Sequence, residues 1–348
     1  MSHSECLSGN YFPRPAKSEA PLLLGRVCSY WRSVALSTHG LWTGISLGKR
    51  YPDHPEDLAG DANAAMQWRI NAGPRAVQSY NLAHHYWGGD EDSLVDLMNI
   101  IIPQHQLWRR IQGLLPLPIA KQILSAIPDA SVLEYLNIAT RNAYHPLDIN
   151  VHTMHRLQKL VLRMDEPVIQ FGACRSQSLR EVIIDQVCTA ITLDVCWLFI
   201  AQCPNLEVFQ ADCYATDAFT FHHLEILRHA HLTYLHLRAM WAEPGPFIDE
   251  IEAPYLKFMT LQYHTIPVMD GWGWPHLTSF LNRSECQLTH FDFGCHPDVR
   301  SRHIELLACY TWVEVPLRGK IFSHDKSHNH KPQVGLREIW RGYFMYQT

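Results

Sequence analysis

The chain has 348 residues, of which 47% are hydrophobic and 18% are charged. This composition excludes a largely disordered chain, and the length is enough for two ordinary domains or one elongated repeat array. The formal net charge of −5 arises from 29 basic and 34 acidic side chains. Because a phosphate-binding surface needs an excess of positive charge, this balance argues against a nucleic acid as the partner.

The N-terminal sequence lacks the apolar core of a secretory signal, and no apolar run approaches the ~20 residues that span a bilayer. We therefore expect an intracellular protein, cytoplasmic or nuclear, with no membrane partner. Its 10 cysteines form no Cys-x-x-Cys pair, which favours free thiols over a disulfide framework.

Residues 1–20 contain Pro13 and Pro15 and show no helical apolar stripe, so the sequence predicts a disordered tail there. From residue 21 to residue 47, apolar residues recur every three or four positions. This spacing predicts an amphipathic helix that ends near Ser37 and Gly40 and is followed by a strand. Such a helix would cap the open end of a repeat array. Its apolar positions are Leu24, Val27, Cys28, Trp31 and Val34.

From residue 133 onward, a pattern of six residues, apolar-x-x-apolar-x-apolar, recurs along the chain. Its leading residues are 24, 22, 27, 26, 24, 32 and 24 positions apart. Most of these spacings fall within the ~20–29 residues of a leucine-rich repeat, and the longest indicates an insertion. The copies are Leu133, Leu136 and Ile138; Leu157, Leu160 and Leu162; Leu179, Val182 and Ile184; Leu206, Phe209 and Ala211; Leu232, Leu235 and Leu237; Leu256, Met259 and Leu261; Leu288, Phe291 and Phe293; and Trp312, Val315 and Leu317.

Each copy predicts a strand, because its last two apolar residues are two positions apart and so point to the same face. The first apolar residue lies at the turn into the strand. A single unit cannot enclose these three side chains, but stacked units bury them at ~1.5–3 kcal/mol each. Weaker copies begin at Trp42 and Val77, and another that begins at Trp108 is interrupted at Gly113.

Helix-like segments between the strands end at prolines: residues 93–102 before Pro103, 119–127 before Pro128, and 193–203 before Pro204. This succession predicts an α/β fold, an irregular leucine-rich-repeat-like solenoid over residues 48–317. Parallel strands would line its concave side and helices its convex side. Residues 318–348 are expected to form a polar loop and a C-terminal partial repeat.

The particular residues at positions 21–47 are more informative than the spacing of the apolar ones. The segment resembles the second half of an F-box, as found in the large F-box families of mushroom-forming fungi. Beyond it, Trp68, Arg69 and Ala72 resemble the helix that these families place before their next strand. The residues that carry the resemblance are Leu22, Leu23, Leu24, Gly25, Val27, Cys28, Trp31, Arg32, Ala35, Leu36, Ser37, Thr38, Leu41 and Trp42.

By this resemblance the protein would be a substrate receptor of a cullin-type ubiquitin ligase, with the F-box holding the adaptor subunit and the repeats selecting a target protein. The helix that normally opens an F-box has no counterpart in residues 1–20, which implies weak or absent adaptor binding. The alternative is a repeat scaffold that binds a partner protein without docking to a ligase. The residues implied to bind the adaptor are Leu22, Leu23, Leu24, Val27, Cys28 and Trp31.

The residues that alternate with the core positions of each strand should face the concave groove. Tyr234 and Phe258 fall on neighbouring strands in this register and predict an exposed aromatic pair. Aromatic anchors with a charged margin are typical of a protein-binding hot spot. The alternative is that loops or the C-terminal tail cover both rings. The predicted partner-binding residues are Tyr234, His236 and Phe258, with a charged rim of Arg163, Asp185, Asp212 and Arg238.

The 22 histidines raise the question of a metal site. The densest cluster, Cys286, His290, Cys295 and His296, is interrupted by core positions of a strand and matches no common zinc spacing. No P-loop, dinucleotide-binding, serine-hydrolase or zinc-protease motif is present. We expect no metal, cofactor or catalytic residue, and an enzyme of unknown class is the least favoured alternative.

Overall fold

The computed structural model describes residues 12–48, 58–83, 91–140, 146–164, 167–173, 175–185, 191–214, 226–240, 244–263 and 274–294. Contacts divide the chain into two units, Met1–Val313 and Glu314–Thr348, and all the described residues belong to the first unit. The predicted copy at Trp312 and the predicted partial repeat of residues 318–348 lie outside the described residues.

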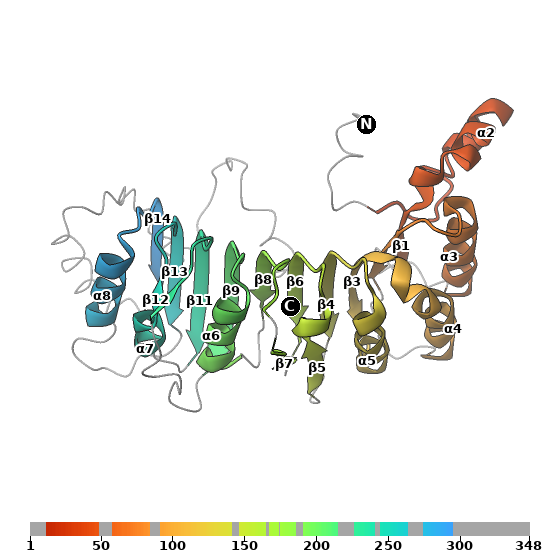
Figure 1. Cartoon of the computed structure of the whole chain (residues 1–348). Coiled ribbons are helices and arrows are strands. Elements are labelled where there is room, and N and C mark those ends of the chain that lie inside the picture. Colours follow the sequence, from red (N-terminus) through yellow and green to blue (C-terminus); the bar gives the residue numbers. More distant parts are fainter. Residues whose placement is uncertain are drawn as a thin grey trace, which may run out of the picture. The chain divides into compact units, whose positions relative to one another are not determined.

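Ten strands form one parallel sheet, in which they follow one another in chain order (Figure 1). They are β1 (Gly44–Gly48), β2 (Gln78–Ala83), β3 (Trp108–Leu115), β4 (Tyr135–Thr140), β6 (Lys159–Arg163), β8 (Glu181–Ile184), β9 (Val208–Tyr214), β11 (Tyr234–Met240), β13 (Phe258–Tyr263) and β14 (His290–Gly294). Among the described residues β1 and β14 do not pair with each other, so the sheet is open. The predicted parallel α/β fold is confirmed.

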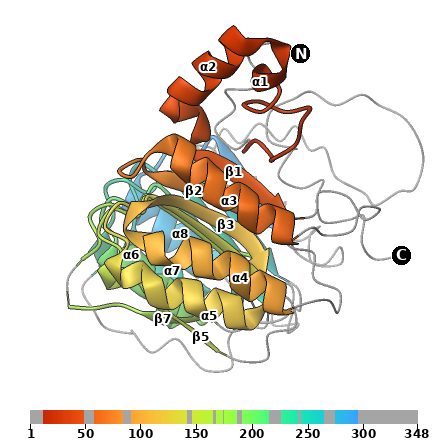
Figure 2. The ribbon, with the colours of Figure 1, turned by 90° about the vertical axis from the view of Figure 1, so that its right-hand side faces the viewer.

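Eight α-helices are found in the described part of the chain. They are α1 (Leu24–Val27), α2 (Ser29–Ser37), α3 (Leu58–Ala72), α4 (Glu91–Ile101), α5 (Leu117–Ala126), α6 (Leu193–Gln202), α7 (Gly245–Asp249) and α8 (Trp274–Ser284). Helices α3 to α8 lie in the connections between consecutive strands of the sheet. Figure 2 shows α3, α4 and α5 one after another on the same side of β1, β2 and β3. The predicted helix ends before Pro103, Pro128 and Pro204 are confirmed to within two residues.

Short parallel strand pairs occupy other connections. β5 (Leu147–Asn150) pairs with β7 (Pro167–Gln170), and β10 (Leu227–Arg228) pairs with β12 (Ile251–Glu252). β5 and β7 lie in adjacent connections and satisfy each other's backbone groups. Short 3-10 helices are found at His39–Trp42 before β1, and at Ile102–Leu107, Ile127–Asp129 and Val151–Thr153 in the connections.

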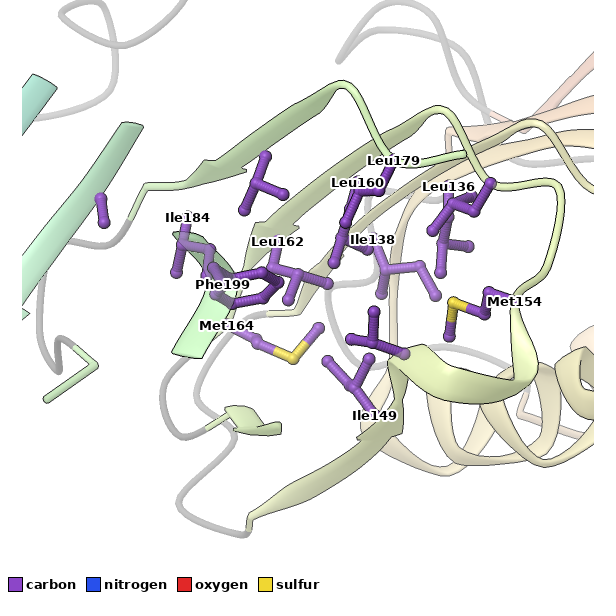
Figure 3. Packing of buried hydrophobic residues seen from close by; sticks show 14 of the residues in the cluster. Leu136, Ile138, Ile149, Met154, Leu160, Leu162, Met164, Leu179, Ile184 and Phe199 are labelled. Carbon is purple, nitrogen blue, oxygen red and sulfur yellow. The ribbon is translucent and has the colours of Figure 1, made fainter. Parts of the chain in front are cut away.

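The core lies between the sheet and these connections. In Figure 3, Leu136, Ile138, Leu160 and Leu162 of two adjacent strands point to the side where Ile149 of β5 lies. All five side chains are 0% exposed. The three apolar residues of six repeat copies, from the copy at Leu133 to the copy at Leu256, are at most 1% exposed, which confirms their predicted core positions.

A ladder of backbone hydrogen bonds marks the start of the strands. The carbonyl of Glu134 accepts the N–H groups of Gln158 and Lys159 of the next unit, at 2.8 and 3.2 Å. The same two-fold acceptance recurs at the carbonyls of Gln158, Arg180, Glu207, Thr233 and Lys257. Each turn is therefore fixed by the turn before it.

Gly113 does not interrupt β3, although it interrupts the apolar pattern. It is paired in register with Leu82 of β2 and occupies the second core position of its strand. A Cβ atom at Gly113 would lie only 2.4 Å from the carbonyl oxygen of Leu82. The close approach of the two backbones therefore requires glycine here.

Residues 12–20 have a defined conformation, which differs from the disordered tail expected over residues 1–20. The Ser46 N–H donates a hydrogen bond of 2.8 Å to the carbonyl of Pro13, and Phe12 is 8% exposed. The Arg14 guanidinium also donates to the Gly48 carbonyl, and the Arg14 N–H donates to the Glu19 carboxylate at 3.0 Å. None of these contacts produces a periodic pattern in the sequence.

Candidate protein-binding surfaces

The face of the sheet away from the helices carries the positions that alternate with the core positions, and we call it the outer face. Parallel register aligns these positions in rows across the strands. The first row is Gly44, Ser79, Arg110, Tyr135, Lys159, Glu181, Val208, Tyr234, Phe258 and His290. The second row is Ser46, Asn81, Gln112, Asn137, Val161, Ile183, Gln210, His236, Thr260 and Asp292.

Three rings of the first row, Tyr234, Phe258 and His290, form an aromatic strip. The ring centroids of Tyr234 and Phe258 are 6.2 Å apart with an angle of 37° between the planes. Phe258 and His290 have the same separation and an angle of 39°. Phe258 is 38% exposed, whereas Tyr234 is partly buried and its burial raises the pKa of its phenol. The predicted contact between Tyr234 and Phe258 is confirmed.

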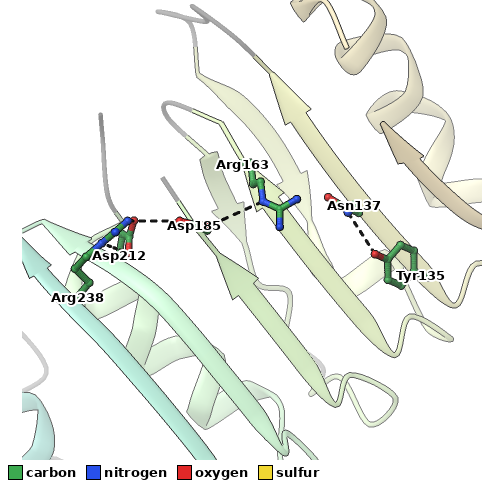
Figure 4. A network of polar contacts seen from close by, with 6 residues as sticks. All are labelled: Tyr135, Asn137, Arg163, Asp185, Asp212 and Arg238. Atoms are coloured by element: carbon green, nitrogen blue, oxygen red, sulfur yellow. Dashed lines mark hydrogen bonds and ion pairs between the residues drawn. The ribbon is translucent and has the colours of Figure 1, made fainter. Parts of the chain in front are cut away.

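The four charged residues predicted as a rim form one network beyond the second row (Figure 4). The Arg238 Nε donates to Asp212 at 2.8 Å, and its Nη2 also donates to that carboxylate and lies 3.4 Å from Asp185. The Arg163 Nε lies 3.9 Å from Asp185. The Asp212 side chain is only 2% exposed, so it positions Arg238 rather than facing a partner directly. Arg163 and Asp185 keep about a third of their surface accessible, at 31% and 29%.

His236 lies in the second row between Gln210 and Thr260. It was predicted to contact a partner, but only 6% of its surface is exposed. Thr260 beside it is 7% exposed. The accessible part of this region of the outer face is therefore the aromatic strip, and His236 lies beneath the surface.

The residues that resemble an F-box extend from Leu22, just before α1, to Trp42, just after α2, and the two helices meet at Cys28. Cys28 has an extended backbone (φ −162°) and separates the two helices that the sequence predicted as one. Leu23, Val27 and Trp31 are 44%, 62% and 43% exposed, and Cys28 is exposed as well. Leu22 and Leu24 are half-buried, and Leu22 packs against the core.

Trp42 fastens α2 to the sheet. Its indole Nε1 donates a 2.8 Å hydrogen bond to the carbonyl of Ala35, the buried residue of α2. Its ring also packs edge-on against Trp68 of α3, with 4.8 Å between the centroids. The contacts of Trp42 and Ala35 hold α2 by its buried residue, while Tyr30, Trp31 and Leu36 of the same helix stay exposed.

The sequence did not single out two residues that the structure adds to these surfaces. Tyr30 is 71% exposed and lies beside Trp31, with ring centroids 6.3 Å apart. Arg110 of the first row lies over two rings, Tyr135 at 4.5 Å and Phe12 at 5.6 Å. Tyr30 is off the apolar stripe, and Phe12 is far from Arg110 in the chain, so periodicity could find neither.

Within the described ranges, no three His, Cys, Asp or Glu side chains are arranged to hold a metal ion. Cys295 and His296 of the Cys/His cluster lie outside those ranges.

Two other pairs of ionisable side chains are in contact. His276 Nδ1 of α8 and the Asp249 carboxylate of α7 form a close pair. The sulfur atoms of Cys196 and Cys213 are 3.4 Å apart in the core, and burial raises the pKa of Cys196 well above its ordinary value.

In the part of the chain that the structure describes, every helix is too short or too polar to cross a bilayer. Comparison with models of protein families gives no match, and comparison with curated proteins gives no match either.

Proposed function

We propose that this protein is a substrate receptor of a cullin-type ubiquitin ligase, which binds an adaptor subunit through α1–α2 and a target protein through the outer face. We also propose that its repeated units form an irregular leucine-rich-repeat-like solenoid. A repeat scaffold without ligase docking is the second candidate, because it requires the outer face alone.

The exposed apolar side of α1–α2 is the observation that carries this proposal. An amphipathic helix that only capped the array would bury its apolar stripe. Instead Val27 and Trp31 of the stripe are 62% and 43% exposed, and Tyr30 beside Trp31 is 71% exposed. A group of exposed apolar side chains is typical of a protein-binding surface, and aromatic rings are frequent anchors there. Four of the exposed residues, Leu23, Val27, Cys28 and Trp31, are among those that the F-box resemblance implies for the adaptor.

Three features support the solenoid. The strands follow one another in chain order, the repeat copies supply equivalent buried positions, and one carbonyl per turn accepts two N–H groups of the next unit. In a repeat array each unit contacts chiefly its neighbours, which agrees with this nearest-neighbour pairing.

The target surface is supported by the aromatic strip and its polar neighbours. Phe258 is accessible, and its ring is held between Tyr234 and His290 in the same row. Rings fixed in this way lose little conformational entropy when a partner binds. Arg163 and Asp185 offer charged groups at a margin of the same face.

The decisive experiment measures binding of the purified full-length chain to the purified adaptor subunit by calorimetry. We expect a measurable dissociation constant, and Val27→Ser with Trp31→Ser should weaken it at least about thirtyfold, or ~2 kcal/mol. The matched control is Ile70→Ser on α3, because Ile70 is an apolar helix residue with 63% exposure outside the proposed surface. Ile70→Ser should leave adaptor binding unchanged.

Absence of any adaptor binding by the folded chain would refute ligase docking and favour the scaffold. If Ile70→Ser weakened adaptor binding as much as the α1–α2 variant does, adaptor binding would be non-specific. Target binding through the outer face is independent of both results and is tested separately by variants of Tyr234 and Phe258.

A further inference from the structure

The segment that carries α1 and α2 contains no acidic residue. The chain as a whole has a net charge of −5, yet no Asp or Glu occurs between Glu19 and Asp53. Arg26 of α1 and Arg32 of α2 lie in this stretch, and both side chains are exposed. The α1–α2 surface is therefore basic as well as apolar, although the whole chain is acidic.

Arg32 connects the two helices. Its Nε donates a hydrogen bond of 2.8 Å to the carbonyl of Gly25 in α1. This bond holds one positive charge at the junction of α1 and α2, and it leaves the two terminal amino groups of the guanidinium to other acceptors. Arg32 takes part in none of the ion pairs found within the described ranges. Its charge is therefore not neutralised by a carboxylate of those residues.

Arg26 lies beside a second cationic residue. Its Nη1 is 3.4 Å from the carbonyl oxygen of Lys17, and Lys17 is exposed as well. The acidic residue nearest to Lys17 in the sequence, Glu19, accepts the backbone N–H of Arg14 at 3.0 Å. Among the residues that the structure describes, no carboxylate forms an ion pair with Arg26 or Lys17. Like charges repel each other, and a negatively charged partner would offset that repulsion.

The two arginines flank exposed apolar side chains. Val27, which is 62% exposed, follows Arg26 directly, and Trp31, which is 43% exposed, precedes Arg32. Protein interfaces commonly place apolar and aromatic side chains at the centre and charged side chains at the rim, and arginine is enriched in them. The pattern on α1–α2 is that of an apolar contact with a positive rim.

We propose that the partner surface that receives α1–α2 is an apolar groove with carboxylates at its margin, and that Arg26 and Arg32 attract those carboxylates. This inference rests on the proposed function, and it gives the chemistry of the adaptor face that α1–α2 contacts. Opposite charges at the rim of an interface speed the diffusional encounter of two proteins and orient them before the apolar side chains meet.

An anionic membrane also attracts apolar side chains that lie beside arginines. A helix that lies on a membrane buries one continuous apolar face. Here Cys28 has an extended backbone (φ −162°) and divides the segment into a helix of 4 residues and a helix of 9 residues. The bond from Arg32 to Gly25 then holds the two helices in one arrangement, which suits a groove of fixed shape better than a fluid surface. We therefore assign α1–α2 to a protein partner.

The test measures the association and dissociation rate constants of the full-length chain with the purified adaptor by stopped-flow fluorescence. Arg26→Gln with Arg32→Gln should slow association about tenfold at about 50 mM salt and leave dissociation nearly unchanged. The difference should shrink at about 300 mM salt, because salt screens charges at the rim. Val27→Ser with Trp31→Ser should instead act mainly on dissociation, because these side chains make contact only in the complex.

Two control variants separate local charge from net charge. Arg156→Gln with Arg175→Gln removes the same number of charges from two exposed arginines, in the turn before β6 and in the connection between β7 and β8. This control should leave the association rate nearly unchanged. Arg26→Lys with Arg32→Lys keeps both charges and should retain fast association. Where loss of the Arg32 bond disturbs the helices, Arg26→Gln alone is used and should slow association about threefold.

A folded wild type that does not bind the adaptor would overturn the proposed function and this inference together. Adaptor binding that is insensitive to salt and to Arg26→Gln with Arg32→Gln, or to Arg26→Gln alone where that variant is used, would overturn this inference and leave the proposed function standing. Equal slowing by the Arg156 and Arg175 control would also overturn it, because net charge alone would then explain the rates. Sedimentation with vesicles of phosphatidylcholine and phosphatidylserine gives the last outcome. Vesicle binding that requires Arg26 and Arg32, with unchanged adaptor kinetics, would assign the surface to a membrane and refute an acidic protein groove.

Discussion

Arg238 on β11 and Asp212 on β9 occupy paired positions of neighbouring strands, and the guanidinium holds both oxygens of the carboxylate. Asp212 is 2% exposed and Arg238 is 19% exposed, so water screens this pair little. Removing one partner of a buried pair leaves an uncompensated charge, which typically costs 3–5 kcal/mol. We therefore predict that Arg238→Met lowers the free energy of unfolding by about 3 kcal/mol in urea titrations.

Two comparisons isolate the buried charge as the cause. The double variant Asp212→Leu with Arg238→Met should lose less stability than Arg238→Met alone, since no unpaired charge remains. Arg109→Met breaks a surface pair with Glu134, whose side chains are 53% and 36% exposed, and should cost less than about 1 kcal/mol. A cost for Arg109→Met equal to that for Arg238→Met would contradict the burial argument.

The aromatic strip gives a second prediction. Tyr234→Ala and Phe258→Ala should each weaken binding of the target protein by ~2 kcal/mol, about thirtyfold, as measured by quantitative co-precipitation from cell extract. Neither variant should lose as much stability as Phe209→Ala, which removes a fully buried ring of the neighbouring strand β9 and should cost ~3–5 kcal/mol.

Tyr255→Ala controls for the loss of an exposed ring. Tyr255 is 61% exposed in the turn before β13, outside the outer-face rows, and its loss should leave target binding unchanged. Stability losses for Tyr234→Ala and Phe258→Ala as large as that for Phe209→Ala would instead assign both rings to the core.

The strands and their register could be predicted from the sequence because the information is local. Leu136 and Ile138 are two positions apart, and this spacing alone places both on the buried face of β4. The same spacing put Tyr234 opposite Phe258 once the copies were aligned. Helix ends followed from the chemistry of Pro103, Pro128 and Pro204, which is equally local.

Burial on the outer face could not be predicted in this way. Asp212 was placed at the correct edge of the sheet, but its burial depends on Arg238, 26 residues later, which also reaches Asp185, 53 residues earlier in the chain. The packing of Phe12–Arg14 against β1 was missed for a related reason. These three residues act through one ring, one carbonyl and one guanidinium, which follow no periodic pattern in the sequence.

A third prediction concerns His229, which is 2% exposed. Its Nδ1 accepts the Leu232 N–H at 3.1 Å, so its Nε2 carries the proton and donates to the Cys203 carbonyl at 3.0 Å. Burial lowers the pKa of His229 below its ordinary value of 6.5. Just below pH 6.5, His229 is therefore protonated in the unfolded chain but still neutral in the folded chain. Protonation then favours unfolding, so the contribution of His229 to stability is lost as the pH falls.

Urea unfolding at several pH values between 7.5 and about 5 tests this prediction. His229→Gln should reduce stability by ~1–2 kcal/mol at neutral pH, and its difference from the wild type should shrink on acidification. His155→Gln is the control for loss of a histidine, because His155 is exposed in the turn before β6 and its replacement should change stability little. A wild-type advantage over His229→Gln that grows with acidity would contradict a lowered pKa.

The last prediction returns to Gly113 of β3, which pairs with Leu82 of β2. A Cβ atom there would lie 2.4 Å from the Leu82 carbonyl oxygen and 2.9 Å from the Leu82 Cβ. Backbone atoms within a paired sheet cannot move away cheaply, and overpacking of this kind typically costs ~1–3 kcal/mol. Gly113→Ala should therefore lower the melting temperature, although alanine is otherwise the smallest change available. Gly40→Ala, which meets no atom within 4 Å, should leave the melting temperature nearly unchanged. Equal melting temperatures for the two variants would show that β2 and β3 can separate at this point, and that glycine is not required in the third strand.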